Sequence, residues 1–209
     1  MKPIIPIFFA TDNTYLPILD VALTSLIQNA SKDYDYVINV INTGLDEKKC
    51  NIIKRLENEN FSINFCDISD KIEAIKSKLK NLYHFSLEAW YRLFIQSLFP
   101  QYDKVLYLDC DLIVLGDISK LYETDIGDSY LGACHEQAMV QEDVYGTYVE
   151  KCLGLDRNRF FNAGIMLINC KSFRENKILE RFVKLLGVYD CRVTQDEDYL
   201  NILCADRVL

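Results

Sequence analysis

The segment KVLYLDCDLIVL (residues 104–115) joins an apolar strand directly to two aspartates. Alternate residues of an extended chain point to one face, so Asp109 and Asp111 project from the same side of one short stretch. Two carboxylates held close together repel each other and stay ionised only when a cation lies between them. Oxygen ligands at a strand end suit a hard divalent cation such as Mn²⁺ or Mg²⁺. The segment therefore indicates either a metal site or a core strand followed by a solvated acidic turn.

Apolar runs that alternate with helical patterns surround this segment on both sides. We expect further strands over residues 4–10, 36–41, 61–68, 130–134 and 164–169. We expect helices over residues 15–29, 46–57, 70–80, 86–99, 140–152, 172–187 and 196–204, with Asp70 and Ser86 as caps. Strands that alternate with helices, several of them apolar on both faces, predict an α/β fold: an open, mostly parallel twisted sheet with helices on both faces. No linker or repeat divides the chain, so we expect one domain over residues 1–209.

Composition excludes several classes of function. The formal charge is −8 and no Lys/Arg cluster forms a stripe, so the chain is a poor candidate for nucleic-acid binding. Eight cysteines occur without a CxxC pair and beside only two histidines, so we expect no zinc site. No signal peptide or membrane-spanning run is present, and we expect reduced thiols in the cytoplasm.

Polar residues at several expected strand ends support a ligand site there. In open α/β sheets ligands bind at the carboxyl ends of the strands. Asp12, Asp109 and Asn162 all fall at or beside such ends. Their agreement favours the metal site over the solvated turn.

Five sequence blocks together resemble one known family. They are FFATDNTYL (residues 8–16), WYRL (90–93), KVLYLDCDLIVL (104–115), FNAGIMLIN (161–169) and QDEDYLN (195–201). In this order and spacing they resemble family 8 of the glycosyltransferases, retaining enzymes that use nucleotide sugars, of the lipopolysaccharide α-galactosyltransferase type. The resemblance covers nearly the whole chain. It implies the Rossmann-like GT-A fold and transfer of galactose or glucose from a UDP-sugar to a glycan or lipid-linked saccharide.

The resemblance also implies a donor site. The uridine pocket would be formed by Ala10, Thr11, Asp12, Asn13 and Tyr15. Arg92 would reach the donor sugar and phosphate, Asp109 and Asp111 would hold Mn²⁺ or Mg²⁺ against the diphosphate, and the Cys110 backbone would meet the ribose. For Asp12 and Arg92 the simpler alternatives are a helix N-cap and a salt-bridged helix residue.

The sugar end of the implied site is formed by residues from two later blocks. Asn162, Ala163 and Gly164 would approach the donor sugar, because small residues let the backbone come close, unless they only form a tight turn. Asp196 would bind sugar hydroxyls, or else cap a helix, and Glu136 lies where the family places polar residues for the acceptor. Glu197 replaces the Gln that the family usually carries in a DQD string. We expect Glu197 to stabilise an oxocarbenium-like transition state and not to attack it as a nucleophile.

The family pattern continues beyond the last helix to a metal-binding histidine and a segment containing Gly, Lys, Pro and Trp. This chain stops at Leu209 before that segment, and neither His84 nor His135 takes the place of the histidine. The resemblance therefore implies a truncated chain whose turnover is in doubt, and whose peripheral membrane association would depend on the C-terminal part.

Other functions fit the same residues. A truncated, non-catalytic relative that binds UDP-sugars remains open. A phosphatase of the haloacid dehalogenase type also places a DxD after an apolar strand, but near the N-terminus and with a distant Lys and acidic pair. A glycosidase needs two carboxyl groups about 5–9.5 Å apart on either side of the sugar, whereas Asp109 and Asp111 resemble a metal clamp.

Overall fold

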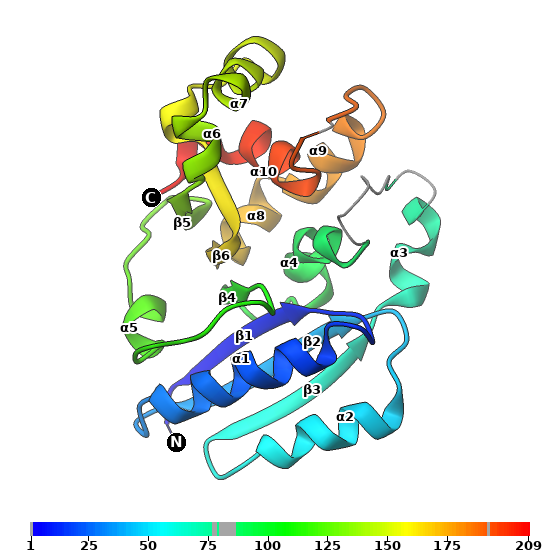
Figure 1. Ribbon diagram of the computed structural model, residues 1–209, viewed down its shortest axis with the longest axis vertical. Helices are drawn as coiled ribbons and strands as arrows, with labels where there is room; N and C mark the ends of the chain where they lie inside the picture. Colours follow the sequence, from blue (N-terminus) through cyan, green and yellow to red (C-terminus); the bar gives the residue numbers. More distant parts are fainter. Residues whose placement is uncertain (1, 77–78, 80–86, 192) are drawn as a thin grey trace.

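A computed structural model of the chain contains one six-stranded sheet with helices on both faces (Figure 1). The structure describes residues 2–76, 79, 87–191 and 193–209. The strand order is β3-β2-β1-β4-β6-β5. The strands are β1 (Ile4–Ala10), β2 (Asp35–Asn42), β3 (Phe61–Asp67), β4 (Lys104–Leu108), β5 (Leu131–His135) and β6 (Phe161–Asn169). The predicted α/β class and the positions of all six strands are confirmed, and β4 ends at Leu108, directly before Asp109.

The order in which the chain adds strands to the sheet reverses at β1. The chain adds β2 and β3 on one side of β1 and then returns to add β4 on the other side, with every one of these pairs parallel. Such a reversal leaves a crevice at the carboxyl ends of the two strands on either side of it. Phe8 pairs with Tyr107, so the residues that follow β1 lie beside those that follow β4.

Strand β6 runs antiparallel to its neighbours β4 and β5. Its first residues therefore lie at the same edge of the sheet as the end of β4. Leu108 pairs with Ile165, and the Asp109 amide donates a hydrogen bond of 2.7 Å to the Gly164 carbonyl. Three sequence blocks thus meet at one edge of the sheet.

The helices cover two large hydrophobic cores on the two faces of the sheet and a small third cluster around Met139, Val149 and Phe160. The helices are α1 (Leu16–Asn29), α2 (Glu47–Ile53), α3 (Ser69–Lys76), α4 (Ile95–Leu98), α5 (Ser119–Tyr122), α6 (Gln137–Gln141), α7 (Asp143–Tyr148), α8 (Cys170–Glu175), α9 (Ile178–Leu185) and α10 (Asp196–Cys204). Alternate strand residues enter opposite cores: Ile7 and Leu106 pack with α1, whereas Phe8 and Tyr107 pack with the segment from η2 (Leu87–Phe94) through α4 and with α8 to α10. Apolar side chains thus fill both faces, as a largely parallel sheet requires.

Three predicted helices differ in the structure. The helix expected over residues 86–99 is a 3₁₀ helix, η2, for most of its length and becomes α-helical only in α4. The helix expected over residues 140–152 is interrupted at Glu142, whose extended backbone separates α6 from α7, and it ends in the π-helical turn η3 (Val149–Leu153). The helix expected over residues 172–187 is divided at Lys177, which has a left-handed φ of 53°.

The remaining short segments are the 3₁₀ turns η1 (Lys54–Leu56), η4 (Arg157–Arg159) and η5 (Ala205–Arg207). Asp70 lies in the first turn of α3, which begins at Ser69, so it is not the cap that we predicted. The predicted cap Ser86 and His84 lie outside the described residues. Among the described residues, no helix has the length and apolar composition needed to cross a bilayer.

Candidate functional site

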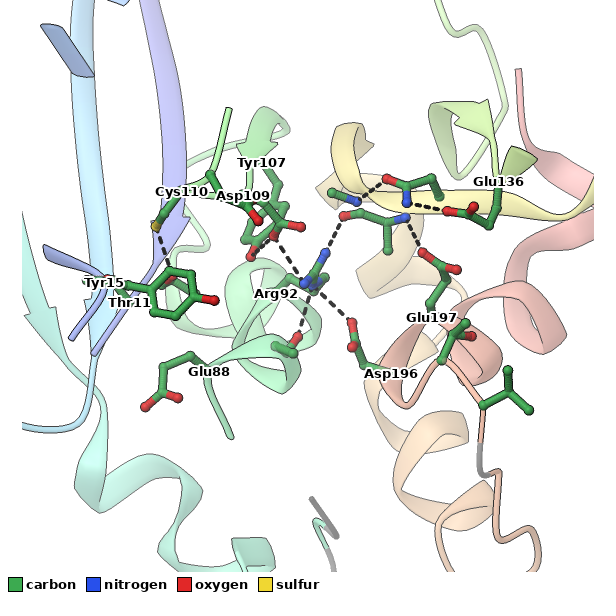
Figure 2. A pocket seen from close by; sticks show the side chains of 18 of the residues that line it. Thr11, Tyr15, Glu88, Arg92, Tyr107, Asp109, Cys110, Glu136, Asp196 and Glu197 are labelled. Carbon is green, nitrogen blue, oxygen red and sulfur yellow. Dashed lines mark hydrogen bonds and ion pairs between the residues drawn. The ribbon is translucent and has the colours of Figure 1, made fainter. Parts of the chain in front are cut away.

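A cavity of about 600 Å³ opens where β1, β4 and β6 meet (Figure 2). Its size falls within the usual range for small-molecule sites. The residues that line it are Ala10, Thr11, Asp12, Tyr15, Glu88, Ala89, Arg92, Tyr107, Asp109, Cys110, Asp111, Glu136, Ala138, Met139, Tyr145, Asn162, Ala163, Gly164, Val193, Thr194, Asp196 and Glu197. All the predicted site residues are among them except Asn13.

The turn after β1 forms one wall of the cavity. Oδ1 of Asp12 accepts hydrogen bonds of 2.8 Å from the amides of Thr14 and Tyr15, immediately before α1 begins. Asp12 therefore fixes the turn before this helix, whose N-cap is Tyr15 and not Asp12 as the simpler interpretation predicted, and Asp12 also lines the cavity. Asn13 instead donates to the Gly44 carbonyl and accepts from the Asp46 amide, so its side chain fixes a neighbouring loop.

The acidic turn after β4 forms the floor. Oδ1 of Asp109 accepts a hydrogen bond of 3.0 Å from the Tyr107 hydroxyl, and Asp111 is exposed to solvent. Gly164 lies so close that a Cβ there would stand 2.7 Å from Oδ2 of Asp109. The missing side chain at Gly164 therefore leaves the room that the Asp109 carboxylate occupies.

The donor set of this turn fits a hard divalent cation. Asp109 and Asp111 supply carboxylate oxygens, the ligand type that Mn²⁺ and Mg²⁺ prefer. No third His, Cys, Asp or Glu completes a metal-binding group with them in the described part of the chain. Burial raises the pKa of the Cys110 thiol to about 12, and its Sγ donates to the Ala10 carbonyl at 3.2 Å. The thiol therefore stays protonated, and the two aspartates are the candidate ligands.

Arg92 connects the two sides of the cavity (Figure 2). Its Nη2 lies 3.2 Å from Oδ1 of Asp109, and its Nε lies 3.0 Å from Oδ2 of Asp196. Nη1 donates to the Ala163 carbonyl, and the guanidinium stands 4.5 Å from the centre of the Tyr107 ring. Burial alone would lower the pKa of Arg92, but the two carboxylates raise it, so the cation persists. Arg92 is salt-bridged, as its simpler interpretation predicted, and it also faces the cavity.

Asp196 lines the cavity, and its Oδ2 is buried against Arg92. Its side chain is 4% exposed, and burial raises its pKa to about 7 even though the Arg92 cation acts against that change. Its Oδ2 accepts no hydrogen bond from the described residues, because the nearby Arg92 Nε–H is directed at the Ala89 carbonyl. Buried carboxylate oxygens usually have hydrogen-bond partners. Asp196 Oδ2 is instead paired with the Arg92 cation at 3.0 Å, while the residue as a whole lines the cavity.

Glu197 lies next to Asp196 and is almost as deeply buried. Its Oε2 accepts a hydrogen bond of 2.8 Å from the Ala163 amide. Burial raises the pKa of Glu197 to about 8; the Ala163 amide opposes this change, while the Asp196 and Glu136 carboxylates add to it. At neutral pH much of this side chain is therefore protonated.

Glu136 and Asn162 form a short polar chain beside Glu197. Oε2 of Glu136 accepts from the Asn162 side-chain amide at 2.6 Å, and Oδ1 of Asn162 accepts from the Gly164 amide at 2.8 Å. Asn162, Ala163 and Gly164 lie within β6, so the alternative of a tight turn entering the strand is wrong. All three line the cavity.

Several lining residues were missing from the predicted site. Tyr107 lies two residues before Asp109 and shares its face of the strand, so the alternation of β4 contained that information. Glu88, Met139, Tyr145 and Thr194 reach the cavity only through the packing of η2, α6, α7 and the turn before α10. Helical periodicity in the sequence carries no signal for that packing.

Comparisons with known proteins agree with this geometry. The model of glycosyl transferase family 8 matches residues 6–209. The chain is 30% identical to general stress protein A of Bacillus subtilis (98% of this chain, 70% of that protein) and 29% identical to glycosyltransferase GlyE of Streptococcus pneumoniae (96% and 45%). Galactosyltransferase LgtC, solved with donor and acceptor sugar analogues, superposes with a TM-score of 0.78 at 28% identity, covering 98% of this chain and 72% of LgtC.

An active-site mutant of LgtC with Glu in place of Gln superposes with a TM-score of 0.83 at 29% identity, covering 98% of this chain and 71% of that one. Together with the sheet described above, these similarities confirm the predicted GT-A fold. The chain spans 60% of the length of a Haemophilus influenzae relative to which it is 28% identical.

Proposed function

Because this chain belongs to glycosyl transferase family 8, we propose that it transfers galactose or glucose from a UDP-sugar to a glycan or lipopolysaccharide-type acceptor with retention of anomeric configuration. Membership of the family supports glycosyl transfer, and it sets aside the phosphatase and glycosidase interpretations of the two aspartates. We propose that residues 1–209 act as one transferase domain. The observation that carries the proposal is that one cavity is lined by Asp109 and Asp111 after β4 together with Arg92, Asp196 and Glu197 from distant parts of the chain.

The uridine end of the donor would lie against the turn after β1. Ala10, Thr11, Asp12 and Tyr15 line the cavity there, and the half-exposed Tyr15 ring offers a flat apolar face to a base. Asn13, which we expected in this pocket, would act indirectly by fixing the loop at Gly44 and Asp46. The Cys110 backbone follows on the same side, where a ribose would lie.

The diphosphate would lie over the turn after β4. Asp109 and Asp111 would hold Mn²⁺ or Mg²⁺, which when bound supplies positive charge that stabilises the diphosphate leaving group. Arg92 adds a permanent cation on the sugar side of the same carboxylate. Carboxyl groups outnumber cationic side chains around the cavity even without counting Asp196 and Glu197, since Asp12, Glu88 and Glu136 also line it.

The sugar would lie between β6 and the start of α10. Asp196 would accept a hydrogen bond from a sugar hydroxyl, and Asn162, Ala163 and Gly164 would meet the ring closely because their side chains are small or turned aside. Glu136 lies farther along the same wall, where an acceptor would enter. The choice between galactose and glucose would rest on single hydroxyl contacts.

Glu197 would stabilise positive charge on the sugar. A protonated carboxyl is a poor nucleophile, and it resembles the amide of the Gln that the family pattern carries at this position. Positive charge developing on the sugar would lower the pKa of Glu197 and favour its carboxylate form. LgtC has been solved with an active-site Gln changed to Glu, and we propose that Glu197 is a natural counterpart of that change.

The acceptor and the location of the protein are also proposals. All eight cysteines are free in the structure, which supports the expectation of a reducing cytoplasm. A glycan or lipid-linked saccharide would be met by peripheral association with the membrane surface.

Titration of UDP into the chain by calorimetry, with and without Mn²⁺, tests the donor site. We expect saturable binding that needs the cation and is lost with EDTA and in Asp109→Ala, whereas Asp125→Ala, an exposed aspartate in a distant turn, leaves binding unchanged. A panel of UDP-hexoses then tests transfer, with the anomer of the product read by NMR. Cation-dependent binding without transfer would identify a donor-binding relative. No binding under any condition would overturn the proposal for this chain.

A further inference from the structure

The turn that precedes α10 has a backbone conformation that few residues adopt. Gln195 is buried and has φ of 54° and ψ of −115°. This backbone conformation is unfavourable for any residue other than glycine. It is found at such a residue only where surrounding contacts stabilise it. Asp196 and Glu197 follow immediately, so the Gln195 turn determines where both carboxyl groups point.

Asp198 holds this turn from inside the protein. Its Oδ2 accepts hydrogen bonds from the amides of Val193 at 3.4 Å and Thr194 at 3.2 Å, and its Oδ1 accepts from the Thr194 hydroxyl at 2.8 Å. Asp198 is fully buried and is not among the residues that line the cavity. Both oxygens are therefore occupied by the chain itself, and neither reaches a ligand.

Tyr148 connects the same carboxylate to another wall of the cavity. Its hydroxyl donates a hydrogen bond of 2.8 Å to Oδ2 of Asp198 from the end of α7, 50 residues earlier in the chain. Tyr145 lies one turn before it and lines the cavity, as does Met139 in α6. One hydrogen bond thus joins the α6–α7 wall to the strained turn.

We propose that Asp198 and Tyr148 are positioning residues that fix the Gln195 turn and thereby direct Asp196 and Glu197 at the donor sugar. The positions of the turn and its partners come from the structure alone, whereas the effect on the sugar rests on the function proposed above. Asp198 is the third acidic residue of the QDED string, and its contacts separate it from the two that face the cavity.

Hydrogen–deuterium exchange of the unliganded chain tests whether Asp198 and Tyr148 fix the Gln195 turn. We expect Tyr148→Phe to increase the exchange rate of the 193–198 amides, because one of the four bonds to Asp198 is lost. Tyr122→Phe is the matched control, since it removes a comparable partly buried hydroxyl, bonded to the Lys104 carbonyl, away from the turn. Equal exchange of the 193–198 amides in wild type and Tyr148→Phe would overturn the proposal whether or not the chain binds a nucleotide.

Paired affinities for UDP and for a UDP-hexose test the effect on the sugar. We expect Tyr148→Phe to weaken UDP-hexose binding by about 3- to 10-fold, the usual effect of one hydrogen bond, and to leave UDP binding unchanged. A general loss of stability would weaken the binding of UDP and of UDP-hexose alike, and that outcome would contradict a positioning role. A wild-type chain that binds neither ligand would instead contradict the proposed function, and the exchange experiment would still decide the role of the turn.

Two substitutions of Asp198 distinguish positioning from direct reaction. In Asp198→Asn the amide oxygen can accept the three bonds made by Oδ2, and the amide nitrogen can donate to the Thr194 hydroxyl. We therefore expect Asp198→Asn to keep UDP-hexose affinity within about threefold of wild type, and Asp198→Ala to lose it like Tyr148→Phe or more. An Asn variant as impaired as the Ala variant, with unchanged exchange of the turn, would show that the carboxylate itself acts on the ligand.

Discussion

Arg92 and Asp196 form an ion pair of 3.0 Å between side chains that are 7% and 4% exposed. They come from η2 and α10, more than a hundred residues apart in sequence, and Arg92 extends the contact to Asp109 after β4. The pair therefore joins the diphosphate side of the proposed site to its sugar side. A buried pair of this kind is costly to break, because either partner alone is left as an uncompensated charge.

Replacement of Arg92 should destabilise the protein strongly. In Arg92→Met we expect the free energy of unfolding to fall by about 3–5 kcal/mol, because Asp109 and Asp196 lose their shared cation. Urea unfolding followed by circular dichroism measures the change. Arg174→Met, which breaks a more exposed pair with Asp103, should cost only about 0–1 kcal/mol from the charge itself. Equal effects of the two substitutions would contradict the structural importance of the Arg92 pair.

Gly164 should be required for cation-dependent binding more than for folding. A Cβ there would stand 2.7 Å from Oδ2 of Asp109 and 3.0 Å from Oδ1 of Asn162, so Gly164→Ala must displace one or both groups. We expect Mn²⁺-dependent UDP affinity to fall about tenfold or more, equivalent to about 1.4 kcal/mol. Gly116→Ala is the control, because a Cβ at Gly116 meets nothing within 4 Å. Unchanged Mn²⁺-dependent affinity in Gly164→Ala would remove Asp109 from the proposed metal site.

Asn13 should contribute to the stability of the loop at Gly44 and Asp46 and not to UDP binding. Its side chain bonds to Gly44 and Asp46, outside the cavity. For Asn13→Ala we expect a loss of about 1–2 kcal/mol in the free energy of unfolding and less than about a threefold change in UDP affinity. Calorimetric titration and urea unfolding of the same preparation test both halves. A large loss of UDP affinity in a stable Asn13→Ala variant would show that Asn13 contacts the ligand in the uridine pocket.

The sequence predicted the sheet and most of the cavity for one physical reason. Apolar runs such as residues 104–108 define strands, and polar residues directly after them must gather at one edge when the strands are parallel. Asp12 and Asp109 were found in this way. Asn162 lies at the start of β6 and reaches the same edge only because β6 is antiparallel, which the expected mostly parallel sheet did not include. The family resemblance added Arg92, Asp196 and Glu197.

What the sequence did not predict depends on contacts between distant segments. The interruption at Glu142, the 3₁₀ form of η2 and the divided α8–α9 segment arise where tertiary packing overrides helical periodicity. Asp198 resembles an ordinary acidic residue of a helix until Tyr148 is seen to donate to it from α7. The contacts of Asn13 could not be predicted for the corresponding reason, since its partners at Gly44 and Asp46 are about thirty residues away.

The raised pKa of Glu197 should make stability fall as pH rises. Its pKa is about 8 in the folded chain and 4.5 in its ordinary state, so between these values the folded chain binds a proton that the unfolded chain has lost. Stability contributed by protonated Glu197 is therefore complete below about pH 4.5 and is lost as pH rises toward 8. Asp196, with a pKa of about 7, acts in the same direction over a narrower range.

Glu197→Gln should remove part of the dependence of stability on pH, because the Gln side chain cannot ionise. Its side-chain oxygen can still accept the hydrogen bond from the Ala163 backbone amide. We expect the melting temperature of wild type to fall between pH 5 and 8 more steeply than that of Glu197→Gln, with the two curves diverging as pH rises. Glu150→Gln is the control: this exposed carboxyl has its pKa lowered by Arg157, so its ionisation state does not change in that window. Parallel melting curves for wild type and Glu197→Gln would mean that Glu197 is ionised in the folded protein at neutral pH, and would remove the reason for regarding it as a poor nucleophile.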